Sequence, residues 1–300
     1  MGHNLNNETI TRPRATKEQT MERRNEGTKE RRNFIYLYAH ENQPVTIRQL
    51  FYAATVNGIS GIEKNETGYG KIQRIALTMR KEGALPYHWI ADHSRSVWGM
   101  NMFSGLNDAA ENWASQYRLD YWDNRPEKVE IWLEKTALAS ALQPVTDKYR
   151  VDLAPTSGFA SEGFVEKAVR TAAYSGKEKL VVYSLYDFDK AGQDASNALG
   201  RAMARLSNMY GIELDYNAIG LGYEQVVDWG LPTRDTKQGR SQWDYPFAAE
   251  LDAIPVRQLR ELVASYLSRH MSEYDLRKLA LTEDRQRAQI TMALSDSGLL

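Results

Sequence analysis

Apolar and polar residues follow two different patterns along this chain, and the change comes near residue 127. Before it, apolar residues recur every three or four positions, which is the spacing of amphipathic helices. From 127 to 222, short apolar runs alternate with helical patterns. This alternation predicts an α/β fold with a parallel sheet covered by helices, and such sheets bind ligands beyond the carboxyl ends of their strands.

The part before residue 100 predicts three helices followed by a short strand pair. The helices are expected over 28–42, 46–58 and 69–83, and the strand pair over 84–95. This order is typical of a winged helix-turn-helix domain, in which the third helix enters a DNA groove. A helical bundle with a solvated basic face is the alternative.

The sheet part predicts four parallel strands with helices between them. The strands are expected over 128–134, 150–157, 179–187 and 212–220. A connector helix over about 106–121 precedes them, and a loop over 223–246 and a helix pair after Leu251 follow. The expected division is a flexible basic arm (1–27), a winged-helix domain (28–100), a connector (101–126), a sheet domain (127–222) and a loop with C-terminal helices (223–300).

Charge is distributed unevenly between these parts. Residues 1–100 carry 15 Lys and Arg against 10 Asp and Glu, a net of +5, whereas 101–300 carry 23 against 29, a net of −6. Because cations bind phosphates and carboxylates bind metals, this predicts a DNA-binding part before a metal-using part. A solvated charged tail is the alternative.

Composition excludes several kinds of chemistry and of location. The chain has no cysteine, which rules out a disulfide framework, a thiol nucleophile and a zinc–cysteine site. No apolar run approaches the roughly 18 residues of a membrane span, and the N-terminus lacks the apolar core of a signal peptide. We therefore expect a cytoplasmic protein with no membrane partner.

The third helix is the candidate DNA-binding helix. Its expected inner stripe consists of Ile72, Ile75, Ala76 and Met79. Lys71, Arg74 and Lys81 lie on the other side, where they could contact the phosphates of double-stranded DNA.

The second helix carries a tyrosine outside its apolar stripe. That stripe consists of Ile47, Leu50, Phe51 and Ala54. Tyr52 is expected to project roughly opposite, one turn after Arg48, so that a phenol and a guanidinium lie side by side on the outer surface. An ordinary surface tyrosine is the alternative.

Three carboxylates follow strands of the expected sheet. Glu134 ends the first strand, and Asp187 and Asp189 end the third and share a face if it continues as a strand. If these strands are neighbours, the carboxylates converge and need a cation, and oxygen ligands favour Mg²⁺ or Mn²⁺. As alternatives, Asp189 could cap the helix that starts at Lys190, and Glu134 could be an exposed strand end.

Two segments of the chain resemble known families. "VEIWLEK" with Glu134 and "YDFDKAG" with Asp187 and Asp189 resemble the Toprim domain of topoisomerases, primases and certain nucleases. "TIRQLFY" resembles the motif of the topoisomerase VI A subunit and the meiotic double-strand-break transesterase, in which an Arg precedes the catalytic Tyr by four residues, as Arg48 precedes Tyr52.

The resemblance covers about residues 30–222, and the chain is most similar to the miniature A-subunit-like members of that superfamily. Two positions depart from the motif, because Gln49 and Phe51 stand where the family often has Asp and Tyr. The resemblance implies an N-terminal winged helix followed by a Toprim-type sheet domain.

The resemblance also implies a reaction. Tyr52 would attack DNA and form a 5′-phosphotyrosyl break, as in a type IIB topoisomerase, and Arg48 would stabilise the developing charge. Asp187 and Asp189 would hold Mg²⁺, and Glu134 would be a general acid or a further metal ligand. A homodimer is implied, and because this chain contains no ATPase, an ATPase subunit could act in trans.

Two other functions stay open. In a hydrolytic Toprim nuclease, water attacks the phosphorus and Tyr52 is only a surface residue. In a catalytically inactive DNA-binding protein, the acidic residues have a structural role.

Overall fold

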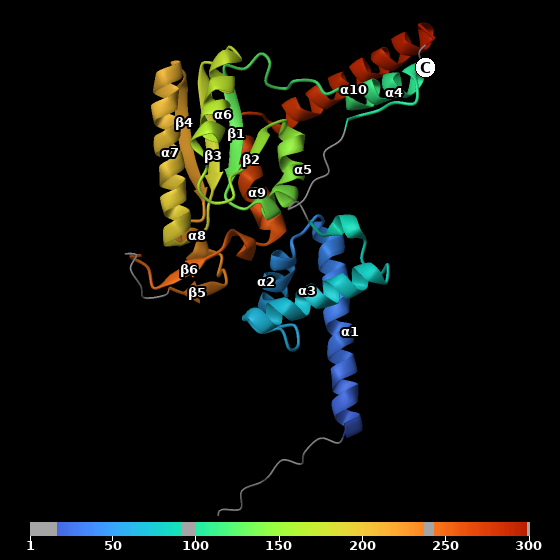
Figure 1. Ribbon diagram of the computed structural model, residues 1–300, viewed down its shortest axis with the longest axis vertical. Coiled ribbons are helices and arrows are strands. Elements are labelled where there is room, and N and C mark those ends of the chain that lie inside the picture. Colours follow the sequence, from blue (N-terminus) through green and yellow to red (C-terminus); the bar gives the residue numbers. More distant parts are fainter. Residues whose placement is uncertain (1–16, 92–99, 237–242, 299–300) are drawn as a thin grey trace, which may run out of the picture.

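A computed structural model describes residues 17–91, 100–236 and 243–298 of the chain. It contains a helical unit at the N-terminus and a larger unit built on a parallel sheet (Figure 1). The expected α/β class, the four-stranded parallel sheet and the helical C-terminal segment are confirmed.

The helical unit packs three helices around one core. They are α1 (Lys17–Asn42), α2 (Ile47–Val56) and α3 (Glu66–Lys81). A capping box starts α2, because Thr46 Oγ1 accepts a hydrogen bond from the Gln49 backbone at 3.0 Å and the Gln49 side chain accepts one from the Thr46 backbone at 2.9 Å. Leu50 of α2 and Ile72 of α3 are fully buried in this core.

Two expectations for the helical unit are wrong. The first helix begins at Lys17, so residues 17–27 of the expected arm are helical; this stretch lacks an apolar period but is rich in good helix formers. Residues 1–16 of that arm lie outside the described residues. After α3, the described residues contain a 3₁₀ turn, η1 (Tyr87–Trp89), and one parallel bridge between Val45 and Ile90 in place of a strand pair. The rest of that expected pair, from residue 92, lies outside the described residues.

The sheet has four parallel strands in the order β2-β1-β3-β4. They are β1 (Glu127–Leu133), β2 (Asp152–Pro155), β3 (Lys179–Leu185) and β4 (Glu213–Gly220). Between them come η2 (Thr136–Leu138) with α5 (Ala139–Tyr149), then α6 (Glu162–Tyr174), then α7 (Lys190–Tyr210). This is the predicted alternation, and it makes β1 and β3 neighbours.

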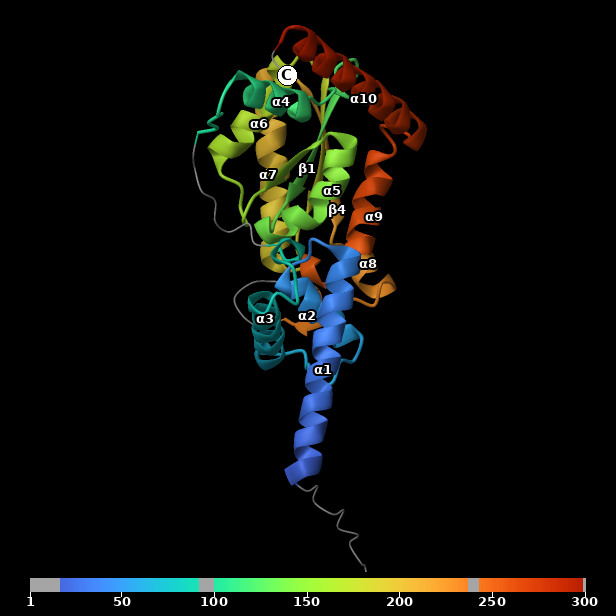
Figure 2. The same cartoon turned by 90° about the vertical axis from the view of Figure 1, so that its right-hand side faces the viewer.

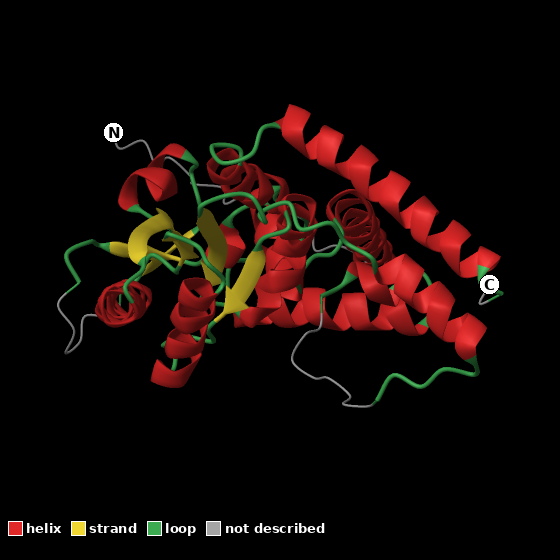
Figure 3. Cartoon of the chain, turned by 90° about the horizontal axis from the view of Figure 1, so that it is seen from above, coloured by secondary structure: helices red, strands yellow, loops and turns green. Residues whose placement is uncertain are grey.

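Helices cover both faces of the sheet (Figures 2 and 3). On one face, Ile131 packs in a core with Leu142 of α5 and Val263 of α9 (Val256–Leu267). On the other face, Trp132 packs in a second core with residues of α6 and α7, including Val169. Strand residues alternate between these two cores as the pleat requires.

The chain after β4 completes the sheet unit. It forms α8 (Tyr223–Asp228), a hairpin of β5 (Thr233–Asp235) and β6 (Phe247–Ala249), η3 (Leu251–Ala253), α9 and α10 (Glu273–Asp296). The expected loop over 223–246 therefore contains a helix and a strand, whereas the expected helix pair is confirmed. At the far end, α10 lies beside α4 (Leu106–Gln116), which is the expected connector helix (Figure 1). Within the described ranges, no helix is both long and apolar enough to cross a membrane.

Candidate functional site

Glu134 and Asp187 meet at the carboxyl edge of the sheet. Glu134 directly follows β1, and Asp187 comes two residues after the end of β3. These two strands are paired along their whole length. The Glu134 carboxylate accepts a hydrogen bond from the Asp187 backbone N–H, with Oε2 2.7 Å from the nitrogen. The expectation that neighbouring strands bring these two residues together is confirmed.

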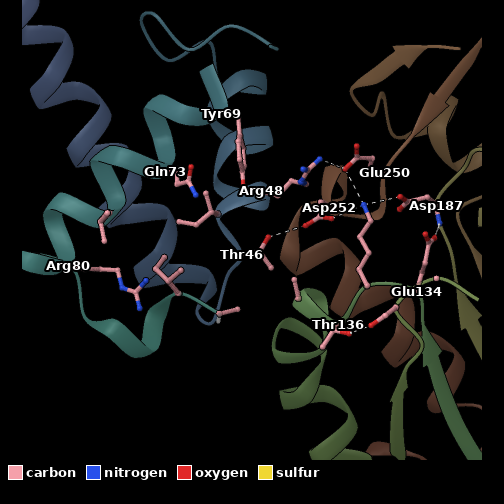
Figure 4. Close-up of a pocket in the computed structure, with 18 residues that line it drawn as sticks. Thr46, Arg48, Tyr69, Gln73, Arg80, Glu134, Thr136, Asp187, Glu250 and Asp252 are labelled. Carbon is pink, nitrogen blue, oxygen red and sulfur yellow. Dashed lines mark hydrogen bonds and ion pairs between the residues drawn. The ribbon is translucent and has the colours of Figure 1, made fainter. Parts of the chain in front are cut away.

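A lysine occupies the centre of the acidic cluster. Lys135 Nζ lies 2.9 Å from Asp187 Oδ2, 3.1 Å from Glu250 Oε2 and 3.0 Å from Asp252 Oδ2. Figure 4 labels these three acidic residues. Glu250 and Asp252 belong to the segment around η3, which leads from the hairpin to α9. One ammonium group therefore neutralises carboxylates from two separate parts of the chain.

Asp189 contacts different partners from Asp187. Strand β3 ends at Leu185, two residues earlier than expected, and the chain then turns into α7. Asp189 caps that helix, since its Oδ1 accepts from the Gly192 backbone at 2.8 Å, and its Oδ2 lies 2.6 Å from Arg234. The alternative that Asp189 is an N-cap is thus confirmed, and the expectation that both Asp side chains point together fails because the strand does not reach them.

The ion pairs of Asp187 and Asp189 argue against the predicted magnesium site in this arrangement. Within residues 17–91, 100–236 and 243–298, no group of three or more His, Cys, Asp or Glu side chains is arranged to hold a metal ion. Lys135 and Arg234 already neutralise Asp187 and Asp189. In this arrangement the three predicted ligands do not fit a metal ion, and the site would have to release these two cations first.

Burial alters the proton affinity of the cluster. Asp187 is 6% exposed, and this burial raises its pKa from 3.8 to about 7, although Lys135 and the Leu251 backbone N–H favour the carboxylate. Burial alone would lower the pKa of Lys135, but Asp252, Asp187 and Glu250 outweigh it and raise the pKa, so this side chain stays charged.

The helical unit faces the cluster across a cleft of about 980 Å³. Arg48 of α2 reaches over it, with Nη1 2.8 Å from Glu250 Oε2, and Thr46 Oγ1 donates a hydrogen bond to Asp252 Oδ1 at 3.1 Å (Figure 4). The ring of Tyr69 lies 5.3 Å from the Arg48 guanidinium and also lines the cleft. The side chain of Arg48 is 43% exposed, so it could contact a ligand there.

Tyr52 is buried, and the expectation that it lies on the outer surface is wrong. It is 7% exposed, its ring lies 5.3 Å from that of Phe51, and it lines a separate cavity of about 140 Å³ together with residues 252–255. The physical reason is that η3 and the turn after it cover the side of α2 opposite the apolar stripe. Burial, together with the nearby charge of Glu250, raises the pKa of Tyr52 to about 12.

The predicted DNA-binding residues lie away from this cleft. Arg74 and Lys81 are exposed, as expected, but Lys71 is partly buried and donates a hydrogen bond to the Gly61 carbonyl at 2.8 Å. The side of α3 that lines the cleft carries Tyr69, Gln73, Leu77 and Arg80 instead.

Sequence reasoning missed Lys135, Glu250 and Asp252. Lys135 directly follows Glu134, and a signal for the other two was present in "AAELDAIP", where two carboxylates interrupt an apolar run. Asp252 is 3% exposed, and a buried carboxylate requires a partner. That partner is more than a hundred residues away in the chain, so the sequence alone did not identify it.

Comparisons of the chain with models of protein families, with curated proteins and with solved structures find no match.

Proposed function

We propose that this protein cleaves DNA at the carboxyl edge of its parallel sheet, as a transesterase similar to topoisomerase VI A subunits. The observation that supports this most is the meeting of Glu134 and Asp187 at that edge, opposite Arg48 of α2. Acid–base groups and a partly exposed guanidinium around one cleft suit a reaction at a phosphodiester, in which a proton moves and negative charge develops.

In this proposal the Tyr52 oxygen bonds to phosphorus while the bond from phosphorus to the 3′ oxygen breaks. The phenol passes its proton to water, and the departing 3′ oxygen takes up one from Glu134, the candidate acid. The protein stays joined to the 5′ end, so the bond energy is kept for resealing. Arg48 stabilises the charge on the reacting phosphate.

The buried position of Tyr52 places a condition on this reaction. Its phenol can meet DNA only after α2 separates from η3, which breaks the contacts from Arg48 to Glu250 and from Thr46 to Asp252. It also removes Tyr52 from the apolar core that it shares with Ala253. A DNA phosphate competes with Glu250 for Arg48, since both form charge-assisted hydrogen bonds with a guanidinium. The released Tyr52 would then act at the sheet edge of a second protomer in a homodimer.

A hydrolytic nuclease is the second candidate, and the burial of Tyr52 favours it. Water can enter the cleft without movement of α2, and no phenol is needed. Mg²⁺ or Mn²⁺ stays a proposed cofactor in both candidates on one condition: Asp187 and Asp189 would have to leave Lys135 and Arg234 before they could hold it. When bound, the ion would supply positive charge at the scissile phosphate. Double-stranded DNA remains the proposed substrate. An ATPase subunit that acts in trans remains a proposed partner.

Both candidate functions require DNA cleavage at the carboxyl edge of the sheet, and an assay of plasmid cleavage in the presence of Mg²⁺ or Mn²⁺ tests this requirement. Asp187→Asn combined with Asp189→Asn should reduce cleavage about a thousandfold, because the carboxylates are lost while Asn still caps α7. Asp194→Asn, which removes an exposed carboxylate from the surface of α7, is the matched control and should cleave like the parent. Equal cleavage by the double variant and the parent would place the active site elsewhere.

A further inference from the structure

Five aromatic side chains gather directly beside the acidic cluster. We call them the aromatic platform: Phe188, Tyr223, Trp243, Tyr245 and Phe247. Phe188 lies between Asp187 and Asp189 in the chain, and its backbone pairs with that of Ala249, with N–O distances of 2.9 and 3.0 Å. This isolated antiparallel bridge holds the platform against the edge of the sheet where cleavage is proposed.

The platform has a buried centre and an exposed rim. Phe188 is 3% exposed and has the rings of Tyr245 and Trp243 at 4.9 and 5.0 Å. Tyr223 and Tyr245 stack on each other at 5.2 Å with an angle of 24° between their planes, yet they are 43% and 37% exposed. The inner rings form a small core for the hairpin, whereas the two tyrosines present flat aromatic surface to solvent.

Charges around the platform favour a base over a duplex backbone as its ligand. Glu224 and Asp244 are exposed beside the two tyrosines in the chain, and they repel closely placed phosphates. A base is uncharged and stacks on aromatic rings whatever its sequence. On the side towards Asp189, the half-exposed Arg234 is the cation that could hold the phosphate of the same strand.

We propose that the aromatic platform binds unpaired DNA bases next to the proposed cleavage site. The substrate would then be DNA with a single-stranded or locally opened segment, and this choice of substrate rests on the proposed function. Stacking on Tyr223 and Tyr245 would place the adjoining phosphate between Arg234 and the sheet edge.

Fluorescence anisotropy of labelled 20-nucleotide strands, measured with the full chain in EDTA, tests this proposal without cleavage. Tyr223→Leu and Tyr245→Leu should each weaken binding of the single strand roughly five- to thirtyfold and change duplex binding less than about twofold. Tyr245→Phe keeps the ring and should bind like the parent. A strand with abasic positions should bind the parent and the Leu variants equally weakly.

Tyr174→Leu is the matched control. Tyr174 is 76% exposed and packs edge-to-face on Tyr210 at 6.0 Å, but it lies at the end of α6, far from the carboxyl edge of the sheet. The proposal is overturned if the parent does not bind the single strand or if the two Leu variants bind it as tightly as the parent does. It is also overturned if the Leu variants lose affinity for single strand and duplex to the same extent. Binding as predicted, together with DNA cleavage that Asp187→Asn/Asp189→Asn does not reduce, would refute the proposed function and leave the platform as a binding site.

Discussion

The two sides of the cleft are held in place by different kinds of contact. On the sheet side, backbone hydrogen bonds fix the residues: the Glu134 N–H donates to the Leu185 carbonyl at 2.9 Å, and the Asp187 N–H donates to the Glu134 side chain at 2.7 Å. On the α2 side, the polar contacts across to η3 are between side chains, from Arg48 to Glu250 and from Thr46 to Asp252.

This difference indicates which side can move. Strand register is a property of the whole sheet, so Glu134 and Asp187 stay together as long as the sheet is folded. In the pair between α2 and the η3 segment, the Arg48 side chain is 43% exposed, so a polyanion can compete with Glu250 for its guanidinium. We therefore regard the sheet side as the fixed part of the site and α2, which carries Arg48 and Tyr52, as the part that would have to move in the proposed reaction. Such a movement would also separate α2 from Ala253 and Val256, which share its apolar core.

Removal of Lys135 should have the largest effect on stability, because its ammonium joins the sheet edge at Asp187 to Glu250 and Asp252 around η3. Lys135→Met leaves Asp187 and Asp252 buried without their cation and leaves Glu250 paired with Arg48 alone, so the free energy of unfolding should fall by about 3–5 kcal/mol. Millimolar Mg²⁺ should recover part of this loss. Denaturant unfolding measures both effects.

Lys148→Met is the control for that experiment. Lys148 pairs with Glu273 on the surface, where both side chains are about half exposed, so its loss should cost less than about 1 kcal/mol. Similar losses for the two variants would mean that Lys135 does not hold the cluster together.

The pH dependence of stability examines the fixed side alone. Because burial raises the pKa of Asp187 to about 7, the folded protein binds this proton more tightly than the unfolded chain does. The stability it contributes is fully present below about pH 4 and is lost as pH rises through about 7. Asp187→Asn cannot ionise and does not lose this stability. As pH rises from 5 to 8, its free energy of unfolding should therefore increase by on the order of 2 kcal/mol relative to that of the parent.

Unfolding curves at pH 5, 6.5 and 8 measure this change. Asp194→Asn, on the surface of α7, should follow the pH slope of the parent. If the free energy of unfolding changes with pH in the same way for the parent and for Asp187→Asn, the folded protein does not disfavour ionisation of Asp187, and the prediction is wrong.

A smaller effect is expected on the outer face of the helical unit. Arg74 and Lys81 are exposed, whereas Lys71 is held by the Gly61 carbonyl. If this face contacts phosphates, the double variant Arg74→Ala/Lys81→Ala should reduce the slope of log affinity against log salt by about 2, and Lys71→Ala by less than 1. Titration of duplex binding against salt provides the slopes; unchanged values in all variants would place the duplex on another surface.

The sequence predicted the fixed side better than the movable one, for a physical reason. Strand alternation determines which residues follow a strand, and neighbouring parallel strands must bring Glu134 and Asp187 to one edge. The same reasoning failed for Asp189 because no pattern marked Leu185 as the last strand residue.

Helical periodicity gives less information about exposure. It identified the apolar stripe of α2 correctly, with Leu50 fully buried, but a second face can be covered by a segment far along the chain. Residues 252–255 cover Tyr52 in this way. The partners of Lys135 were missed for the same reason, since Glu250 is 115 positions away in sequence.

The most direct test of the transesterase account is to ask whether Tyr52 becomes joined to DNA. Labelled DNA is incubated with the parent or with Tyr52→Phe and separated under denaturing conditions, with and without protease treatment. The account predicts protein on the 5′ ends for the parent and no attachment for Tyr52→Phe, with DNA binding retained by both. Robust cleavage by Tyr52→Phe with free 5′ ends in both proteins would contradict it and leave the hydrolytic nuclease.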